Sequence, residues 1–134
     1  MDNVSDSPLQ ALLVDDNATN IALASALLKK FKLDATIASD GQQAVGRSKE
    51  KRYDVILMDC LMPNMDGYEA TTIIRQDPQN PNSETPIIAL TGNASPEDRE
   101  ACLSAGMSDF LEKPLRPMNL IKVLGKWTHF TTPS

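Results

Sequence analysis

The sequence has few cysteines and histidines, no long apolar run and no excess of basic residues. It contains two cysteines and one histidine in 134 residues, too few for a structural zinc site or a disulfide framework. No apolar run approaches the roughly 20 residues that cross a bilayer, and the first eight residues are acidic and polar, unlike a signal peptide. The net charge is −5, whereas a general nucleic-acid binder needs a basic surface. These absences argue against a membrane span and direct nucleic-acid binding, and they predict a cytoplasmic protein.

The composition is that of one ordinary globular domain. Hydrophobic residues make up 41% and charged residues 23% of the chain, and a chain of this length buries about two-thirds of its unfolded surface. We expect a single folded domain at residues 9–128, with a flexible N-terminal tail at 1–8 and a C-terminal tail at 129–134.

Short apolar segments alternate with amphipathic ones along the chain. The apolar segments are too short for helices and mostly lack polar alternation, which is typical of parallel strands covered on both faces. They lie at residues 11–14, 35–38, 55–58, 87–90 and 110–111. Helices are predicted at 19–31, from an apolar stripe, at 118–126, and after three capping pairs: Asp40 with Gln43, Asp66 with Glu69, and Ser95 with Asp98. This alternation predicts an α/β fold with a parallel sheet and helices on both faces. The segment 77–86, with three prolines, is predicted to be a surface loop.

Polar residues follow the predicted strands where each strand ends. Asp15 and Asp16 come after the first strand, Asp59 after the third, Thr91 after the fourth and Lys113 after the fifth. In an open parallel sheet, ligands bind beyond the carboxyl ends of the strands. We therefore expect these side chains to meet at one edge of the sheet.

The residue types at this edge suit phosphoryl chemistry. Three neighbouring carboxylates repel one another unless a cation joins them, and hard oxygen ligands suit Mg²⁺. A lysine and a hydroxyl beside the cation can bind an incoming anion, so the site fits a phosphoryl group. A carboxylate there can act as the nucleophile and form an acyl phosphate.

Four motifs, each at a strand end, carry a resemblance to a known family. They read LLVDDN at 12–17, MDCLMPNMDGYEA at 58–70, ALTGNA at 89–94 and KP at 113–114. With them the chain resembles the receiver domain of two-component response regulators, and most closely the receivers of hybrid sensor histidine kinases. The resemblance covers nearly all of residues 10–128 and implies a flavodoxin-like, doubly wound (βα)5 fold with strand order 2-1-3-4-5.

The resemblance also implies a role for each residue of the site. Asp59 would be the phosphoacceptor. Lys113 would pair with the phosphoryl oxygens, Thr91 would move to hydrogen-bond them, and Phe110 would be the aromatic switch. The Lys113–Pro114 peptide would be cis. The Mg²⁺ ligands would be Asp15, Asp16, Asp59 and the backbone carbonyl of Leu61.

As a receiver, the chain would take part in two-component or phosphorelay signalling. Asp59 would take a phosphoryl group from a phosphohistidine on a histidine kinase or histidine-phosphotransfer domain, docked near Ile21, Ala24 and the exposed part of Leu28. Phosphorylation would switch the surface of the fourth helix, fifth strand and fifth helix, about residues 95–126, and could drive formation of a homodimer. The chain would catalyse only its own phosphorylation and dephosphorylation, and its parent protein could be a hybrid kinase anchored in a membrane elsewhere.

Other residues near the site have simpler interpretations. Asp66 is interpreted as a helix cap, Cys60 as buried packing and Cys102 as a helix-face residue, and His129 lacks the helical setting of a phosphotransfer histidine. Leu61 offers no amide to orient an attacking water, although Asn93 could. We therefore predict a phosphoryl lifetime of minutes or longer.

Three alternatives are open at this point. An aspartyl-nucleophile phosphatase acting on small molecules would usually have a second aspartate where this chain has Leu61. A flavin-binding electron carrier of the same fold class would have a hydroxyl- and glycine-rich loop after the first strand, where this chain has DDNA at 15–18. A purely structural receiver-like module would fail to bind Mg²⁺.

Overall fold

The computed structural model describes residues 8–92 and 95–130. In this part of the chain, five strands and five helices alternate as predicted: β1 (Gln10–Val14), α1 (Ala18–Lys30), β2 (Asp34–Ala38), α2 (Gly41–Ser48), β3 (Val55–Asp59), α3 (Gly67–Gln76), β4 (Ile87–Thr91), α4 (Pro96–Ala105), β5 (Asp109–Glu112) and α5 (Pro117–Trp127). None of these helices is long and apolar enough to span a membrane.

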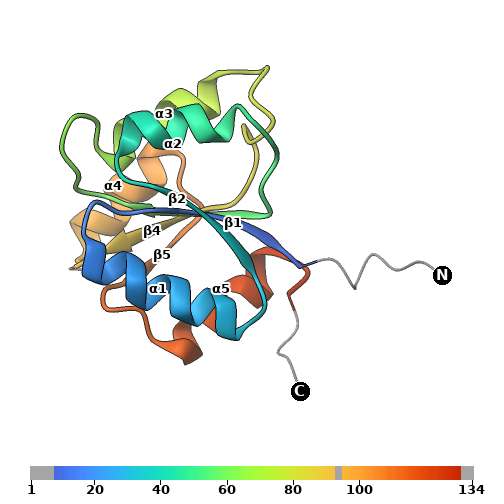
Figure 1. The fold of residues 1–134 in the computed structure, drawn as a ribbon. Helices are drawn as coiled ribbons and strands as arrows, with labels where there is room; N and C mark the ends of the chain where they lie inside the picture. Colours follow the sequence, from blue (N-terminus) through green and yellow to red (C-terminus); the bar gives the residue numbers. More distant parts are fainter. Residues whose placement is uncertain (1–7, 93–94, 131–134) are drawn as a thin grey trace.

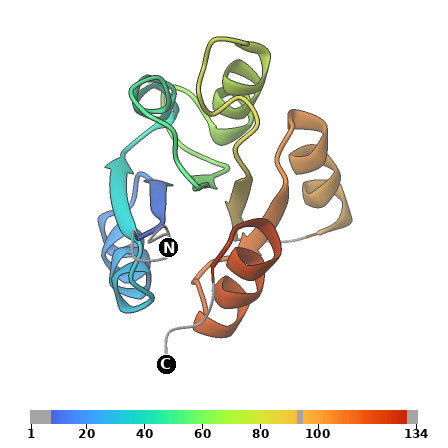
Figure 2. The same cartoon turned by 90° about the vertical axis from the view of Figure 1, so that its right-hand side faces the viewer.

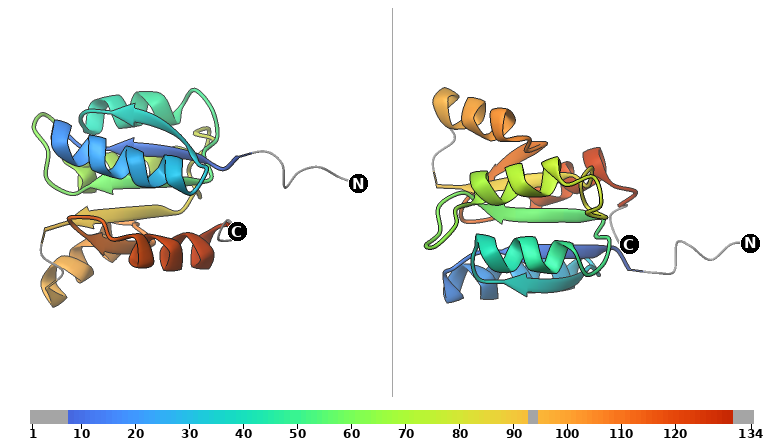
Figure 3. Two further views of the ribbon diagram at one scale, coloured as in Figure 1. Left: turned by 60° about the horizontal axis from the view of Figure 1, so that its bottom comes forward. Right: turned by 90° about the horizontal axis from the view of Figure 1, so that it is seen from above.

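The strands form one parallel sheet between two layers of helices. The strand order is β2-β1-β3-β4-β5, which confirms the doubly wound fold. Helices α2, α3 and α4 cover one face of the sheet and α1 and α5 the other (Figure 1). Figure 3 shows the two layers in turn, first α1 and α5 in front and then α2, α3 and α4.

The core lies on both faces of the sheet. In β1, Leu13 points into the cluster beneath α1 and α5, whereas its neighbour Leu12 points into the cluster beneath α2 and α3. All residues of β3 and β4 are buried. This double coverage explains why the strands appear in the sequence as continuous apolar runs.

The predicted capping residues begin their helices. The carboxylate of Asp40 accepts a hydrogen bond from the Gln43 N–H at 2.8 Å, and that of Asp66 accepts one from the Glu69 N–H at 2.9 Å. The Ser95 hydroxyl accepts the Asp98 N–H at 3.2 Å. Each bond satisfies a donor that the helix itself leaves free.

The segment 77–86, predicted as a surface loop, contains a buried polar network. The side chain of Asn82 is fully buried; it accepts the Tyr53 N–H at 2.7 Å and donates to the carbonyls of Ser48 at 2.6 Å and Lys51 at 2.8 Å. The prediction was wrong at three residues, which are buried because they hydrogen-bond to the last residue of α2 and to the α2–β3 connection: Asn80, Asn82 and Thr85.

We expect Asn82→Ala to lower the free energy of unfolding by about 2–6 kcal/mol, since it leaves two buried backbone groups, the Tyr53 N–H and the Ser48 carbonyl, without this partner at about 1–3 kcal/mol each. Urea denaturation measures the change. The exposed Gln79 in the same loop provides the control, and Gln79→Ala should change stability by less than about 0.5 kcal/mol. Equal stability of the two variants would contradict a structural role for the network.

The chain after α5 returns to the domain. The ring of Phe130 lies 6.1 Å from that of Phe31 in an edge-to-face arrangement, and Phe130 packs against the core cluster beneath α1 and α5. Packing contacts therefore reach two residues beyond the predicted domain boundary at residue 128.

Candidate functional site

The carboxyl ends of four strands bring the predicted site residues together. Asp15 follows β1, Asp59 ends β3, Thr91 ends β4 and Lys113 follows β5. Carboxylate oxygens of Asp15, Asp16 and Asp59 all lie within 4.8 Å of one another. The predicted convergence at one edge of the sheet is therefore observed.

Asp59 is buried and in direct contact with the positively charged side chain of Lys113. The Lys113 ammonium donates a hydrogen bond to Asp59 Oδ1 at 3.1 Å, and the Leu61 N–H lies 3.3 Å from the same oxygen. Burial raises the pKa of the Asp59 carboxyl, and the negative charge of Asp15 raises it further, while the hydrogen bond from Lys113 opposes the shift. The negative charge on Asp59 is therefore costly in this site unless further positive charge approaches.

The carboxylate cluster has the donor set of a hard divalent cation. Asp15 is buried, and its Oδ1 accepts the Asn17 N–H at 3.0 Å, whereas Asp16 is exposed at the rim. An all-oxygen set with one open side suits Mg²⁺, which binds through a few carboxylates and keeps several waters. Leu61, whose carbonyl is the predicted further ligand, lies in the loop directly after Asp59, and its side chain is 75% exposed.

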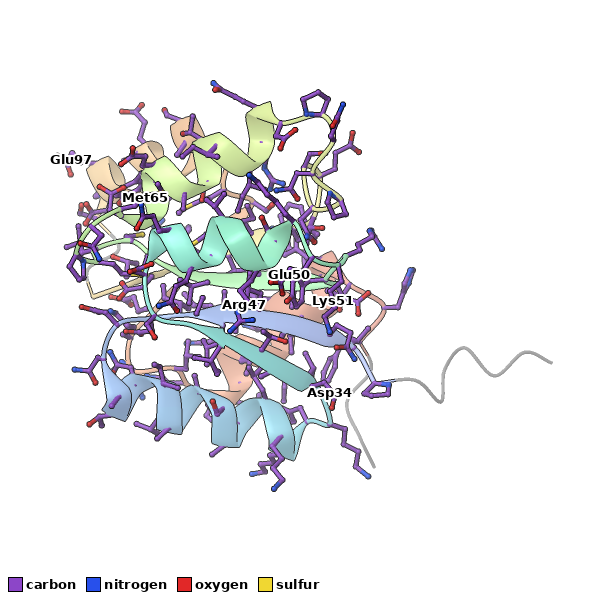
Figure 4. The ribbon with its side chains drawn as sticks, turned by 45° about the horizontal axis from the view of Figure 1, so that its top comes forward. Asp34, Arg47, Glu50, Lys51, Met65 and Glu97 are labelled. Carbon is purple, nitrogen blue, oxygen red and sulfur yellow. The ribbon has the colours of Figure 1, made fainter. Side chains whose placement is uncertain are left out.

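Two glycines allow the β3–α3 loop to lie close to its neighbours. A Cβ atom on Gly67 would come within 2.1 Å of the Asp59 carbonyl oxygen, and one on Gly41 within 2.3 Å of the Met65 carbonyl oxygen. Figure 4 labels Met65 beside the start of α2. Neither glycine is among the residues predicted from the sequence to form the site, although each one directly follows a capping aspartate.

Thr91 and Lys113 are joined through their backbones. The Lys113 N–H donates to the Thr91 carbonyl at 2.7 Å, and the following Lys113–Pro114 peptide is cis, as the resemblance implied. Phe110 is half-buried on β5, with the guanidinium of Arg99 from α4 4.7 Å from the centre of its ring. Asn93 lies outside the described residues.

The simpler interpretations of neighbouring residues agree with the structure. Cys60 and Cys102 are buried with their sulfur atoms 4.0 Å apart, and burial raises the pKa of the Cys60 thiol to about 12, so it stays protonated. Asp66 caps α3, and His129 is exposed after the end of α5.

The predicted docking residues on α1 need a correction. Leu28 is fully buried and Ala24 is 4% exposed, because this side of α1 packs on the sheet, and Ile21 is half-buried. The adjacent Leu23 is 48% exposed. It lines a small pocket beside the site together with residues of α1, β4 and the loops after β1 and β5: Asp15, Asn20, Ala24, Leu90, Lys113, Pro114 and Leu115.

Comparisons with known proteins agree on one family. Residues 11–125 match the model of the response regulator receiver domain. The chain is 43% identical over 119 residues to hybrid signal transduction histidine kinase B of Dictyostelium discoideum, covering 82% of this chain and 6% of that kinase. It thus spans a small part of such relatives.

Two solved structures share the fold. The first is the receiver domain of sensor histidine kinase PA1611 from Pseudomonas aeruginosa, with a magnesium ion in its active-site cleft (44% identity, TM-score 0.82, covering 90% of this chain and 98% of that one). The second is the receiver domain of Saccharomyces cerevisiae Ssk1 in complex with the histidine phosphotransfer protein Ypd1 (31% identity, TM-score 0.81, covering 94% and 92%). Together with the site geometry, these matches show that the chain belongs to the receiver domains of two-component and phosphorelay signalling.

Proposed function

We propose that this receiver accepts a phosphoryl group on Asp59, with Mg²⁺ bound by Asp15, Asp16, Asp59 and the carbonyl of Leu61. The observation that carries the proposal is the meeting of three carboxylates within 4.8 Å, with the Lys113 ammonium 3.1 Å from Asp59. The magnesium ion in the related P. aeruginosa receiver supports the choice of metal. The receiver domain would comprise residues 9–128, with tails on either side.

The transfer needs a nucleophile and positive charge around it. A carboxylate oxygen of Asp59 would attack the phosphorus of a phosphohistidine, and the phosphorus–nitrogen bond would break with its electron pair returning to the imidazole. Mg²⁺, when bound, would neutralise charge on the phosphoryl group. Lys113 and the Leu61 N–H already face Asp59 Oδ1, so they are placed to hold the carboxylate during transfer.

Phosphorylation would change the contacts of Thr91 and Lys113. The phosphoryl group adds a charge of about −1.5 to −2, taking the phosphoester value as a guide. Because the backbones of these two residues are hydrogen-bonded, a displacement of either side chain would change the positions of both β4 and the end of β5. The difference in contacts would shift an equilibrium in which Thr91 and Phe110 move and the surface from Ser95 to Lys126 changes.

The donor would be a histidine kinase or a histidine-phosphotransfer domain, docked over the exposed apolar side chains next to Asp59. Leu23 on α1 and Leu61 in the β3–α3 loop are 48% and 75% exposed, and Leu23 lines the pocket between α1 and Pro114. The complex of the related Ssk1 receiver with Ypd1 supports this type of partner. The switched surface could also join two copies of the chain.

The whole protein would act in the cytoplasm, either as a response regulator or as part of a hybrid kinase. The match to the receiver-domain family favours this interpretation over a phosphatase or a flavin carrier. The chain itself would only gain and lose its own phosphoryl group.

Incubation with a phosphorylated histidine-phosphotransfer domain tests the function. With Mg²⁺ present, the phosphoryl label should leave the donor and appear on this chain as a base-labile acyl phosphate. Label that never leaves the donor would contradict the proposal. Steady turnover of a small phosphate ester, with no label on the chain, would instead favour a phosphatase.

The exposed Leu61 should make the acyl phosphate long-lived. We expect the label to decay over minutes or longer, because this side chain cannot hydrogen-bond an attacking water. Leu61→Asn should speed hydrolysis about two- to tenfold, the worth of one such hydrogen bond. Filter-binding time courses measure the decay, with the exposed Leu103 on α4 as the control site (Leu103→Asn). Decay of the wild-type label within seconds in Mg²⁺ buffer would contradict this explanation.

A further inference from the structure

Helix α4 buries few of its side chains. Of its ten residues only Cys102 is buried, whereas α5 buries three side chains. Figure 2 shows α4 at the edge of the molecule, outside the last strand of the sheet. Segments with few buried apolar side chains open or shift at low cost, so we expect α4 to shift against the sheet more easily than α5.

The two ends of α4 are fixed in different ways. Just after its C-terminal end, the Gly106 carbonyl accepts a hydrogen bond from Arg75 Nε at 2.9 Å. In its N-terminal half, the Arg99 guanidinium lies 4.7 Å from the centre of the Phe110 ring on β5. None of the ion pairs within the described residues involves Arg99. The cation–π contact is therefore what links the exposed side chain of Arg99 to the sheet.

Phe110 lies on β5, which leads to Lys113 of the phosphorylation site, and beside β4, which ends at Thr91. It is paired in register with Ala89 of β4, two residues before Thr91, and it stands three residues before Lys113 on its own strand. The ring is half-buried and lines a groove between α4 and α5. A movement of Thr91 or Lys113 toward a phosphoryl group would therefore displace the backbone next to this ring.

We propose that Arg99 is a positioning residue that holds Phe110 and α4 in the arrangement observed here, and so opposes the phosphorylated one. The inference depends on the proposed phosphorylation of Asp59. In this arrangement the Lys113 ammonium contacts the Asp59 carboxylate directly, a contact that a phosphoryl group on Asp59 would take over. Because the Arg99–Phe110 contact is made only while ring and helix keep these positions, it stabilises one arrangement and not the other.

The binding of beryllofluoride, a phosphoryl mimic, tests the proposal in the presence of Mg²⁺. Arg99→Gln should bind it about two- to fivefold more tightly, since an exposed cation–π contact is worth about that factor. Glutamine has a helix propensity close to that of arginine, so α4 should persist. Arg99→Lys, which keeps the cation, should bind with an affinity between those of wild type and Arg99→Gln.

A double substitution separates the contact from long-range charge. Removing a positive charge would by itself weaken the binding of an anion, which is opposite to the expected result. In a Phe110→Leu background, Arg99→Gln should no longer tighten binding, because the ring is absent. Unchanged or weaker binding by Arg99→Gln, or an equal gain in both backgrounds, would overturn the role of Arg99 while leaving phosphorylation of Asp59 intact. A wild-type chain that binds no beryllofluoride would overturn the proposed function and this inference with it.

Discussion

Asp59→Asn should abolish phosphorylation of the chain by acetyl phosphate and by a phosphorylated donor domain. The amide nitrogen and oxygen of asparagine are too weakly nucleophilic to form the acyl phosphate. The other two carboxylates of the cluster, Asp15 and Asp16, are proposed to bind the cation and not to accept the phosphoryl group. Intact-protein mass spectrometry measures the gain of a phosphoryl group. Asp66→Asn is the matched control, because asparagine still caps α3, and it should label like the wild type. Equal labelling of Asp59→Asn and wild type would contradict the assignment of the acceptor.

The same variant should be no less stable than the wild type, which separates loss of function from loss of fold. Burial raises the pKa of Asp59, so the folded state binds a proton there more readily than the unfolded state. The wild type is therefore stabilised as the pH falls through this raised pKa, and it loses that contribution as the pH rises again. In the absence of Mg²⁺, Asp59→Asn should unfold at a higher temperature than the wild type at neutral pH, and the difference should shrink as the pH is lowered.

Mg²⁺ should stabilise the wild-type chain, and Asp15→Asn should remove most of the effect. At a hundredfold excess over the dissociation constant, bound Mg²⁺ adds about 2.7 kcal/mol to the free energy of unfolding. Changes around metal ligands lower the affinity for the metal about 10–100-fold. The loss of the Asp15 carboxylate should therefore reduce the stabilisation by Mg²⁺ to about 1.4 kcal/mol or less at the same Mg²⁺ concentration. A chelator should likewise stop phosphoryl transfer to the wild type.

Denaturation curves with and without Mg²⁺ measure this stabilisation. Asp34→Asn provides the control. Asp34 is exposed at the start of β2 (Figure 4), whereas the carboxylate cluster lies at the opposite, carboxyl ends of the parallel strands. It should respond to Mg²⁺ like the wild type. Equal stabilisation of Asp15→Asn and wild type would mean that the ion binds elsewhere.

Much of the fold and site could be predicted because local signals determine them. The continuous apolar runs arise from strands covered on both faces, as Leu12 and Leu13 illustrate by packing on opposite sides of the sheet. The capping residues Asp40 and Asp66 are recognisable from a partner three positions later. The site followed from one rule of topology, that parallel strands bring their carboxyl ends to a common edge.

The features that were missed depend on contacts between distant segments. Asn82 is buried because its amide fits the backbone of the α2–β3 connection, and nothing in a proline-rich segment indicates such a partner. The apolar stripe of α1 was predicted, but its buried members Ala24 and Leu28 were expected to face a partner. The exposed apolar side chain in this part of α1 is Leu23. The contact of Arg99 with Phe110 depends on where α4 lies against β5.

The most direct test of the account is a two-dimensional amide NMR spectrum recorded before and after addition of Mg²⁺ and then beryllofluoride. We expect Mg²⁺ to shift the signals of Asp15, Asp16 and Leu61, and beryllofluoride to extend the changes to Thr91, Phe110 and Lys113. Signals of the distant Asn82 network should stay in place. If neither addition moved the signals around Asp59, or if both moved only residues far from the carboxyl edge of the sheet, the carboxylate cluster would not be the phosphorylation site.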